Sequence, residues 1–419
     1  MSKSKIVLAY SGGLDTTIIT KWLSEKDYEV ICCLIDLGQK VENIEALKEK
    51  ALKFGATKAL SYDMKEEFVE NYVYKAMKWN AKYEGEYLLG TSLARPLIAK
   101  KQIEIAIQEG AEYVAHGATG KGNDQVRFEM AYFALKPDIK IIAPWKDAEF
   151  LATFPGRQEM IAYANQHHIP IKATADQPWS TDENLMHISF EAGMLEDPWT
   201  KPLPEMFELT KSPQQASDTP QELFIDFEKG LPVAINNQPL KPAQLLDLLN
   251  TIGGEHAIGR LDMVENRFVG MKSRGVYETP GATILWAAHK AMESITMDRD
   301  TMHLRDSLMP EFAEKTYYGF WFCDAMNGLD AFIQTAQEYI TGTVRLELYK
   351  GNITITGRKS PFSIYDTKIA SMDSDGGAYN QQDAIGFIKL NALPQRIQAL
   401  KRKGSHSALT SSPNYPSHV

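Results

Sequence analysis

The chain has 419 residues, of which 44% are apolar and 24% are charged, with a net charge of −9 and three cysteines. This length exceeds one ordinary domain, and no apolar run approaches the roughly 18 residues of a membrane span. The negative charge argues against a nucleic-acid partner, because Lys and Arg supply most phosphate contacts. The apolar run after Lys5 is too short and too strand-like for a secretory signal, so we expect no export. We therefore expect a cytoplasmic protein with neither a membrane nor a nucleic-acid partner.

The first part of the chain alternates short β-branched runs with helical stretches, which is typical of a parallel sheet covered by helices. The predicted strands are residues 6–10, 30–35, 56–61, 113–115, 139–143 and 171–173. The predicted helices include residues 42–54, a helix that begins at Pro96, and residues 156–168. We predict a doubly wound α/β nucleotide-binding domain over residues 1–173.

The strand–helix alternation ends near Thr174, where a different organisation begins. Residues 223–227 pair with 233–235 and residues 344–349 with 353–356 as predicted hairpins, so residues 174–382 form a predicted α+β domain. Residues 202–220, rich in Pro, Ser, Gln and Thr, are a predicted surface excursion. A lone amphipathic helix at 383–403 needs a partner for its apolar face and is interpreted as an oligomerisation helix. Residues 404–419 are a predicted disordered tail.

A phosphate-binding loop is predicted at AYSGGLDTT, residues 9–17, between a strand and a helix. Backbone N–H groups converge at such a turn, and the helix dipole favours an anion there. Gly12 and Gly13 allow phosphate to approach the main chain. Asp15 either caps the helix or helps to hold a phosphate-bound Mg²⁺. The alternative is a plain strand-to-helix turn, and the Gly-Lys-Ser/Thr ending of a Walker loop is absent.

A second polar loop is predicted at HGATGKGNDQVRFE, residues 116–129, directly after the strand at 113–115. Lys121 and Arg127 can pair with phosphate or carboxylate, whereas Asn123 and Asp124 can receive an ammonium group. Ligands of doubly wound sheets bind at the carboxyl ends of the strands. We therefore expect the two loops to face each other, although the segment read alone could be a flexible connection.

The first loop resembles the SGGxD signature of the N-type ATP pyrophosphatases, and the second resembles the corresponding loop of argininosuccinate synthases. The segments EYLLGTSLARP (residues 86–96), PWSTDENLMHIS (178–189) and VENRFVGMKSRGVYETP (264–280) are also similar to that family. The resemblance extends to about residue 390. It implies an adenine nucleotide alpha hydrolase-like ATP domain, a synthetase and multimerisation domain, and a homotetramer.

The resemblance also implies a reaction. L-citrulline and L-aspartate condense to argininosuccinate while ATP, accompanied by Mg²⁺, becomes AMP and pyrophosphate. The citrulline ureido oxygen attacks the α-phosphate to give citrullyl-AMP, and the aspartate amine then displaces AMP. Adenylation is needed because the ureido nitrogens donate into the carbonyl and make it a poor electrophile. Such an enzyme is a carbon–nitrogen ligase of arginine biosynthesis.

Site residues follow from the same resemblance, position by position. The ATP-binding positions are Ala9, Tyr10, Ser11, Gly12, Gly13, Leu14, Asp15, Thr16, Thr17, Ile35 and Gly117. The citrulline-binding positions are Tyr87, Ser92, Asn123, Arg127, Ser180, Ser189, Glu265 and Tyr277. The aspartate-binding positions are Thr119, Asn123 and Asp124, and the candidate catalytic residues are Asp124, Lys121 and Asp15.

Several of these roles stay open at the level of the sequence. Asp124 could deprotonate the aspartate amine or form a salt bridge with its ammonium, and Lys121 could neutralise pyrophosphate or a substrate carboxylate. Arg127 suits an α-carboxylate, and Glu265 suits an ammonium group or the ureido nitrogens. We expect no protein metal site, because the adjacent His167 and His168 lack the i, i+4 spacing that shares a helix face.

Two departures from the family pattern occur. Thr17 stands where Ser is common, and Gly281 and Ala282 appear in reversed order close to Tyr277. Two rival functions also remain: another ATP pyrophosphatase with a different acceptor, and a nucleotide sensor without catalysis. The first would carry a glutaminase domain, catalytic cysteines or a basic face, and the second would not need the second loop.

Overall fold

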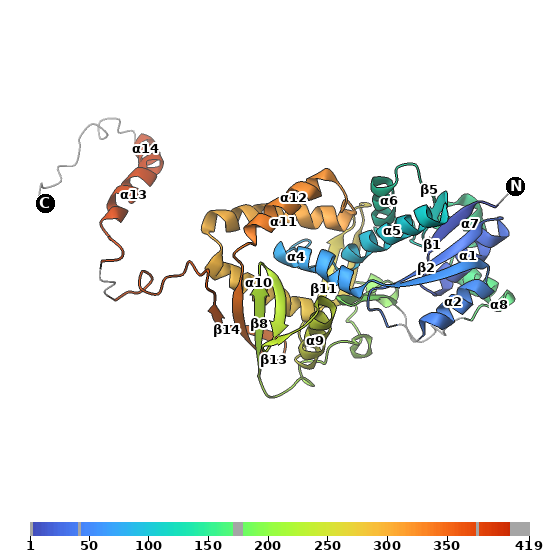
Figure 1. Ribbon diagram of the computed structural model, residues 1–419, viewed down its shortest axis with the longest axis horizontal. Coiled ribbons are helices and arrows are strands. Elements are labelled where there is room, and N and C mark those ends of the chain that lie inside the picture. Colours follow the sequence, from blue (N-terminus) through green and yellow to red (C-terminus); the bar gives the residue numbers. More distant parts are fainter. Residues whose placement is uncertain (1–2, 41–42, 171–178, 374–376, 403–419) are drawn as a thin grey trace, which may run out of the picture. The chain divides into compact units, whose positions relative to one another are not determined.

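The computed structural model describes residues 3–40, 43–170, 179–373 and 377–402. The chain divides into two units, residues 1–364 and 365–419. The first unit contains three sheets (Figure 1). The strand predicted at 171–173, the domain boundary predicted at 173/174 and the tail predicted at 404–419 lie outside the described residues, so the domain division stays a prediction.

A five-stranded parallel sheet forms the N-terminal part, as the sequence predicted (Figure 1). Every neighbouring pair is parallel, in the order β3-β2-β1-β4-β5. The strands are β1 (Lys5–Ala9), β2 (Glu29–Asp36), β3 (Ala56–Asp63), β4 (Tyr113–Ala115) and β5 (Lys140–Ile142). The helices around them are α1 (Leu14–Glu25), α2 (Ile44–Lys53), α5 (Gly90–Glu109), α6 (Asp124–Leu135), α7 (Ala148–Thr153) and α8 (Arg157–Gln166), with the 3-10 turn η2 (Pro144–Lys146).

Both faces of the central strands β1 and β2 are buried, which explains why these two strands are nearly continuous apolar runs. Ile6 and Leu8 of β1 pack in a core with residues of α1, α7 and α8, whereas Val7 packs in another core with residues of α5. Side chains alternate across a strand, so adjacent Cys32 and Cys33 point to opposite faces. Both cysteines are buried, and burial raises the pKa of Cys32 to about 12 and also raises that of Cys33. They are therefore packing residues of the two cores.

The helix predicted to start at Pro96 begins earlier, at Gly90. Pro96 therefore lies inside α5, where it removes one i to i−4 hydrogen bond. Glycine is required at the first position of α5, because a Cβ at Gly90 would lie 2.5 Å from the ring of His187. The preceding segment is one continuous helical stretch made of α3 (Lys65–Phe68), the π-helical turn η1 (Val69–Val73) and α4 (Tyr74–Lys78).

Two antiparallel sheets follow, as expected for an α+β region. One has the order β11-β12-β7-β6, with β6 (Ser180–Asn184), β7 (His187–Glu191), β11 (Arg260–Asn266) and β12 (Lys272–Glu278). The other has the order β10-β9-β8-β13-β14, with β8 (Gln221–Glu228), β9 (Leu231–Ile235), β10 (Gln238–Pro239), β13 (Gly342–Tyr349) and β14 (Asn352–Lys359). Both predicted hairpins are confirmed.

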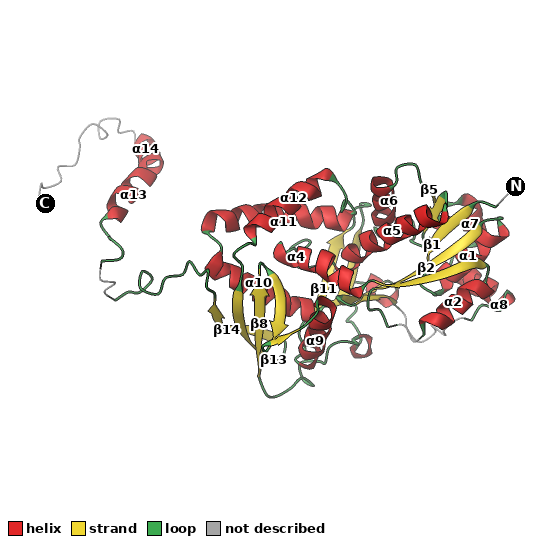
Figure 2. Cartoon of the chain, in the orientation of Figure 1, coloured by secondary structure: helices red, strands yellow, loops and turns green. Residues whose placement is uncertain are grey.

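Four long helices accompany these sheets (Figure 2). They are α9 (Pro242–Glu255), α10 (Pro280–Thr296), α11 (Arg299–Tyr318) and α12 (Asp324–Ala336), and the 3-10 turns η3 (Gly193–Glu196) and η4 (Pro204–Met206) connect other segments. The excursion at 202–220 is irregular but anchored. The fully buried carboxylate of Glu278 accepts hydrogen bonds from the backbone N–H groups of Glu208, Leu209 and Thr210 at 2.7 to 3.1 Å.

The second unit holds two helices, α13 (Asp383–Asn391) and α14 (Leu393–Arg402), so the single helix predicted at 383–403 is interrupted. The break has a local cause: Pro394 lacks an N–H to continue the preceding helix and restricts the residue before it. No residue of either helix is buried. Ile385, Phe387, Ile388 and Leu390 are more than half exposed.

Candidate active site

The glycine loop lies between β1 and α1, as predicted. Gly12 has φ +77°, a left-handed conformation that glycine adopts without a Cβ penalty. Gly13 caps α1 in an extended conformation, and no side chain caps its N-terminus. The first N–H groups of α1 are therefore available to an anion. Lys50 of α2 donates to the carbonyl of Gly12 at 2.8 Å and fixes the loop from outside.

The hydroxyl groups of this loop divide into two kinds. Thr17 is fully buried; its hydroxyl donates to the carbonyl of Gly13 at 2.7 Å and lies 3.1 Å from the hydroxyl of Tyr10. Burial raises the pKa of Tyr10 to about 12, so this phenol stays a donor. Ser11 is exposed and lies 3.1 Å from the hydroxyl of Thr16. Ser11 is therefore accessible from solvent, whereas Thr17 stabilises the loop.

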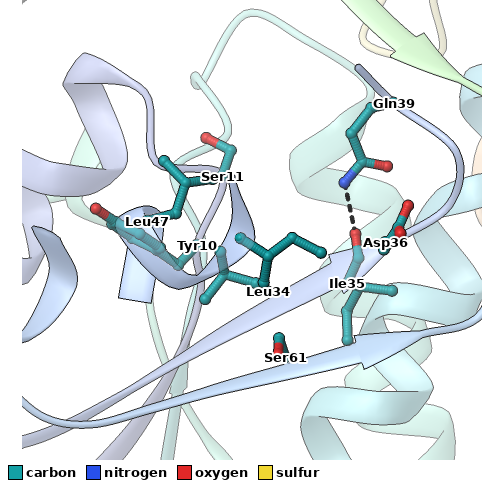
Figure 3. A pocket seen from close by; sticks show the side chains of 9 residues that line it. Tyr10, Ser11, Leu34, Ile35, Asp36, Gln39, Leu47 and Ser61 are labelled. Atoms are coloured by element: carbon teal, nitrogen blue, oxygen red, sulfur yellow. Dashed lines mark hydrogen bonds between the residues drawn. The ribbon is translucent and has the colours of Figure 1, made fainter. Parts of the chain in front are cut away.

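A shallow hollow, open to solvent, lies beside the loop at the carboxyl ends of β1, β2 and β3 (Figure 3). Figure 3 shows Leu34, Ile35 and Leu47 as its apolar part, with Ser61 at its edge. The side-chain amide of Gln39 donates to the carbonyl of Ile35 at 2.7 Å. The hollow therefore offers an apolar surface beside a phosphate-type turn.

The second loop lies against the first, which brings the two predicted motifs together. A Cβ at Gly117 would lie 3.3 Å from side-chain atoms of Thr16 and Ile19 in α1. Within the loop, the backbone N–H of Ala118 donates to Nδ1 of His116, whose Nε2 lies 3.1 Å from Glu129. Thr119 and Lys121 are exposed. The residues at the tip of the loop are therefore exposed to solvent, whereas buried contacts hold its base.

Asp124 occupies the first position of α6 between two arginines. Its Oδ1 accepts from Arg127 at 2.7 Å, and its Oδ2 accepts from Nε of Arg95 at 3.0 Å. Arg95 also donates to Asp182 of β6 at 2.6 Å. Burial opposes ionisation of Asp124, but the two guanidinium groups outweigh it and hold its pKa at about 2. A carboxylate with this pKa is a weak base.

Arg127 connects this ion-pair network to a tyrosine cluster. Its Nε donates to the carbonyl of Tyr317 at 2.8 Å, and its guanidinium lies 4.8 Å from the centre of that ring. Glu265 accepts from the hydroxyls of Tyr277 at 2.8 Å and Tyr317 at 2.5 Å. Burial, and next the charge of Glu265, raise the pKa of both tyrosines. Tyr87 stacks on Tyr277 at 4.6 Å. These residues form a buried polar cluster in which both charges are present.

The predicted serines reach the same region from different elements. Ser189 of β7 lies opposite Tyr277 in the sheet and donates to the carbonyl of Asp182 at 3.3 Å. Ser180 is exposed on β6. Ser92 is fully buried in α5, and its hydroxyl has no hydrogen-bond partner within the described ranges. Asn123 accepts from the N–H of Phe268 at 2.9 Å, which ties the second loop to the turn between β11 and β12.

Four further residues belong to the site but were not singled out from the sequence: Thr91, Arg95, Asp182 and His187. Thr91 lies 3.1 Å from both Asp182 and Nε2 of His187, and it donates its N–H to the hydroxyl of Tyr87 at 3.0 Å. All four fall inside the quoted family segments, which was the available signal. Tyr317 had no such signal, because it lies in none of those segments.

A glycine turn follows the first strand of a five-stranded parallel sheet, and it faces a second polar loop that follows the neighbouring strand β4. This arrangement defines an ATP-binding α/β protein of the N-type ATP pyrophosphatase class. The family described as "Arginosuccinate synthase N-terminal HUP domain" matches residues 5–170, and "Arginosuccinate synthase C-terminal domain" matches residues 179–398. The chain belongs to the argininosuccinate synthase family.

Similar proteins support this membership over nearly the whole chain. A protein of Syntrophus aciditrophicus named argininosuccinate synthase is 55% identical, over 95% of this chain and 98% of its own. A protein of the same name from Thermotoga sp. (strain RQ2) is 54% identical, over 96% of this chain and 99% of its own. Another, from Desulfatibacillum aliphaticivorans, is 55% identical over 95% of this chain and 98% of its own.

The described residues contain neither a metal-binding cluster nor a membrane-spanning helix. In the part of the chain that the structure describes, three or more His, Cys, Asp or Glu side chains nowhere gather as a protein-held metal ion would require. Across the same ranges, no helix has the length and apolar composition needed to cross a membrane.

Proposed function

We propose that the two loops and the tyrosine cluster carry out the reaction of the argininosuccinate synthase family in the following arrangement. The chain is a carbon–nitrogen ligase that uses ATP to join L-citrulline to L-aspartate, and it releases argininosuccinate, AMP and pyrophosphate. The reaction passes through citrullyl-AMP and belongs to arginine biosynthesis. The observation that carries the arrangement is the close approach of Gly117 to Thr16, which puts both loops at one edge of the sheet.

ATP binds with its base beside Ile35 and its phosphates at the start of α1. The apolar surface of the shallow hollow suits one face of a purine, and the N–H groups near Gly12 and Gly13 suit phosphate oxygens. Mg²⁺ favours one or two carboxylates plus substrate phosphates. This preference fits a loop that carries Asp15. Exposed Lys121 neutralises pyrophosphate charge as it leaves.

Citrulline binds along the wall formed by Arg127, Glu265 and Tyr277. Arg127 pairs with the α-carboxylate and Glu265 pairs with the ammonium group or the ureido nitrogens. The partnerless hydroxyl of Ser92 is then satisfied by the substrate, because a buried hydroxyl without a partner is costly. This wall directs the ureido oxygen toward the nucleotide, where it attacks the α-phosphorus and expels pyrophosphate.

Aspartate binds at Thr119, Asn123 and Asp124, and its amine attacks the activated carbon while AMP leaves. Of the two roles considered for Asp124, we assign the charge-pairing one. A group with a pKa of about 2 accepts protons weakly near neutral pH. Asp124 therefore positions the amino group and balances Arg95 and Arg127.

We also propose that the protein acts as a homotetramer in the cytoplasm. The apolar side chains of α13 and α14 are exposed within their unit, and contiguous exposed apolar surface marks an interaction site. The charge of −9 provides no broad basic face for nucleic acid.

A direct assay tests this function. Purified protein is mixed with ATP, Mg²⁺ and citrulline, and pyrophosphate release is followed with and without aspartate. We expect sustained release with aspartate and a single burst without it. No release under either condition would refute the function, and equal release with unrelated acceptors would refute the proposed citrulline site.

A further inference from the structure

A second hollow lies away from the loops and contains none of the predicted site residues. It encloses about 360 Å³ and is open to solvent, which lies at the lower end of the size range of small-molecule sites. It lies where α3, η1 and α4 meet α5, β9 and α12. Its lining residues are Glu67, Glu70, Asn71, Tyr72, Lys75, Lys78, Lys100, Leu231, Trp321, Phe322 and Gln334.

Lys78 is the unusual member of this lining. Only 6% of the residue is exposed, and among the described residues its ammonium has neither a hydrogen bond nor an ion pair. The other two lysines are paired: Lys75 with Asp330, and Lys100 with Glu67 at 2.7 Å. Burial, and next the charge of Lys75, lower the pKa of Lys78. A buried cation without a partner destabilises a fold, so an anionic group bound beside Lys78 would relieve that cost.

The rest of the hollow has room for the body and the second charge of such a ligand. Tyr72 stacks on Trp321 with ring centres 4.9 Å apart, and Leu231 and Phe322 add apolar surface. Glu70 is exposed and has no ion-pair partner within the described ranges. Glu70 and Tyr72 lie on the π-helical turn η1, a local structure that often occurs at functional sites.

We propose that this hollow binds a small α-amino acid, whose carboxylate pairs with the ammonium of Lys78 and whose ammonium pairs with Glu70. The unpaired charges of the lining are the buried ammonium of Lys78 and the exposed carboxylate of Glu70. These two charges complement the carboxylate and the ammonium of a zwitterion. The aromatic and apolar surface receives the side chain.

The hollow is connected to the proposed citrulline site through two short segments. Trp321 follows Tyr317 by four residues, and Tyr317 holds both Arg127 and Glu265. Lys78 precedes Tyr83, whose ring stacks on that of Tyr317 at 3.6 Å. An occupant therefore changes the position of Tyr317 and with it the apparent KM for citrulline. This second step rests on the proposed function, whereas binding itself does not.

Binding is measured by thermal unfolding of the full-length protein, without ATP, in a panel of common amino acids at millimolar concentration. Citrulline and aspartate are left out because they also occupy the active site, and acetate and inorganic phosphate serve as simple anions. We expect at least one amino acid to raise the Tm in a concentration-dependent way. Lys78→Met should weaken that binding by roughly tenfold or more, because a charge-assisted bond is lost. Glu70→Gln should weaken it less, and Lys359→Met, an exposed lysine on β14, should leave it unchanged.

The unliganded variants give a second readout. Lys78→Met should unfold at a higher temperature than the wild type because an unpaired buried charge is removed, and it should keep the wild-type KM values for citrulline and aspartate. In the wild type, the bound amino acid should shift the KM for citrulline, and Lys78→Met should abolish that shift. Binding without a KM shift would overturn the connection only. If no amino acid raises the wild-type Tm, if the rise survives Lys78→Met, or if phosphate alone reproduces it, the amino-acid site is wrong.

Discussion

At the scale of single residues, Asp124 is the most constrained group of the site. It accepts hydrogen bonds from Arg95 and Arg127, and Arg95 also donates to Asp182 on strand β6. These part-buried ion pairs join α5, α6 and β6 at the place where the second loop enters its helix. Removing one member of such a network leaves the other charges unbalanced.

Replacing Asp124 by Asn should separate the two half-reactions. The change removes the charge that positions the aspartate amine, so kcat/KM for aspartate should fall by roughly 10²-fold, whereas citrulline-dependent ATP–pyrophosphate exchange should fall much less. Asp138→Asn, an exposed carboxylate paired with Lys136, is the matched control. Equal losses in both assays would show that Asp124 does not act on aspartate specifically.

His187 should give the protein a measurable acid sensitivity. Burial lowers the pKa of its ring to about 4 from 6.5, so the unfolded chain binds the proton first as the pH falls. Stability is therefore retained above pH 6.5 and lost between pH 6.5 and 4, by about 3 kcal/mol in total at about 1.4 kcal/mol per pH unit. Urea unfolding of His187→Gln should show a correspondingly smaller loss over this window. The exposed His303→Gln is the control, and identical pH profiles for wild type and His187→Gln would contradict the buried-histidine interpretation.

The sequence could predict site residues that lie in recognisable segments, but not the way distant segments meet. Arg95 lies in a quoted segment, yet its pairing with Asp182 depends on a strand 87 residues further along the chain. Tyr317 lies at the end of α11 and joins the site through its carbonyl and hydroxyl groups. Such contacts follow from tertiary packing, and local residue patterns do not predict them.

At the scale of elements, the turn between β1 and α1 contains two adjacent glycines that differ in backbone conformation. Gly12 has φ +77°, and a Cβ there would lie 2.5 Å from Leu47, whereas Gly13 has φ −70° and its nearest neighbour is 3.4 Å away. Gly12→Ala should therefore lower the free energy of unfolding by about 1–2 kcal/mol, and Gly13→Ala should change it by less than about 0.5 kcal/mol.

Both alanines should raise the KM for ATP, because each Cβ obstructs the approach of phosphate to the main chain. Urea denaturation and steady-state kinetics check the two effects separately. Equal stabilities for the two variants would contradict the left-handed turn, and an unchanged KM for ATP in Gly13→Ala would contradict the phosphate position.

Element types were predictable from periodicity, whereas some ends were not. The parallel strands and both hairpins follow from β-branched runs and turn residues. Proline is a good marker of a first helical turn, yet Pro96 lies inside α5, which begins six residues earlier at Gly90. Pro394 had the opposite effect and divided a predicted helix. Tertiary contacts decide which of these effects a proline has.

At the scale of the whole molecule, the exposed apolar residues of α13 and α14 lead to the prediction of a tetramer. Deleting residues 383–419 should reduce the mass measured by light scattering below that of a tetramer, because the deletion removes the apolar side chains that contact other subunits in this proposal. Deleting only residues 404–419 is the control and should leave the tetramer intact. A tetramer that survives the longer deletion would remove these helices from the interface.

The most direct test of the whole arrangement is a crystal structure with citrulline and a non-hydrolysable ATP analogue. We predict that the phosphates contact the main chain at Gly12 and Gly13, that the base lies beside Ile35, and that the ureido oxygen faces the α-phosphorus from the wall of Arg127 and Glu265. A triphosphate bound away from Gly12 and Gly13, or a citrulline that cannot reach it, would contradict the proposed chemistry.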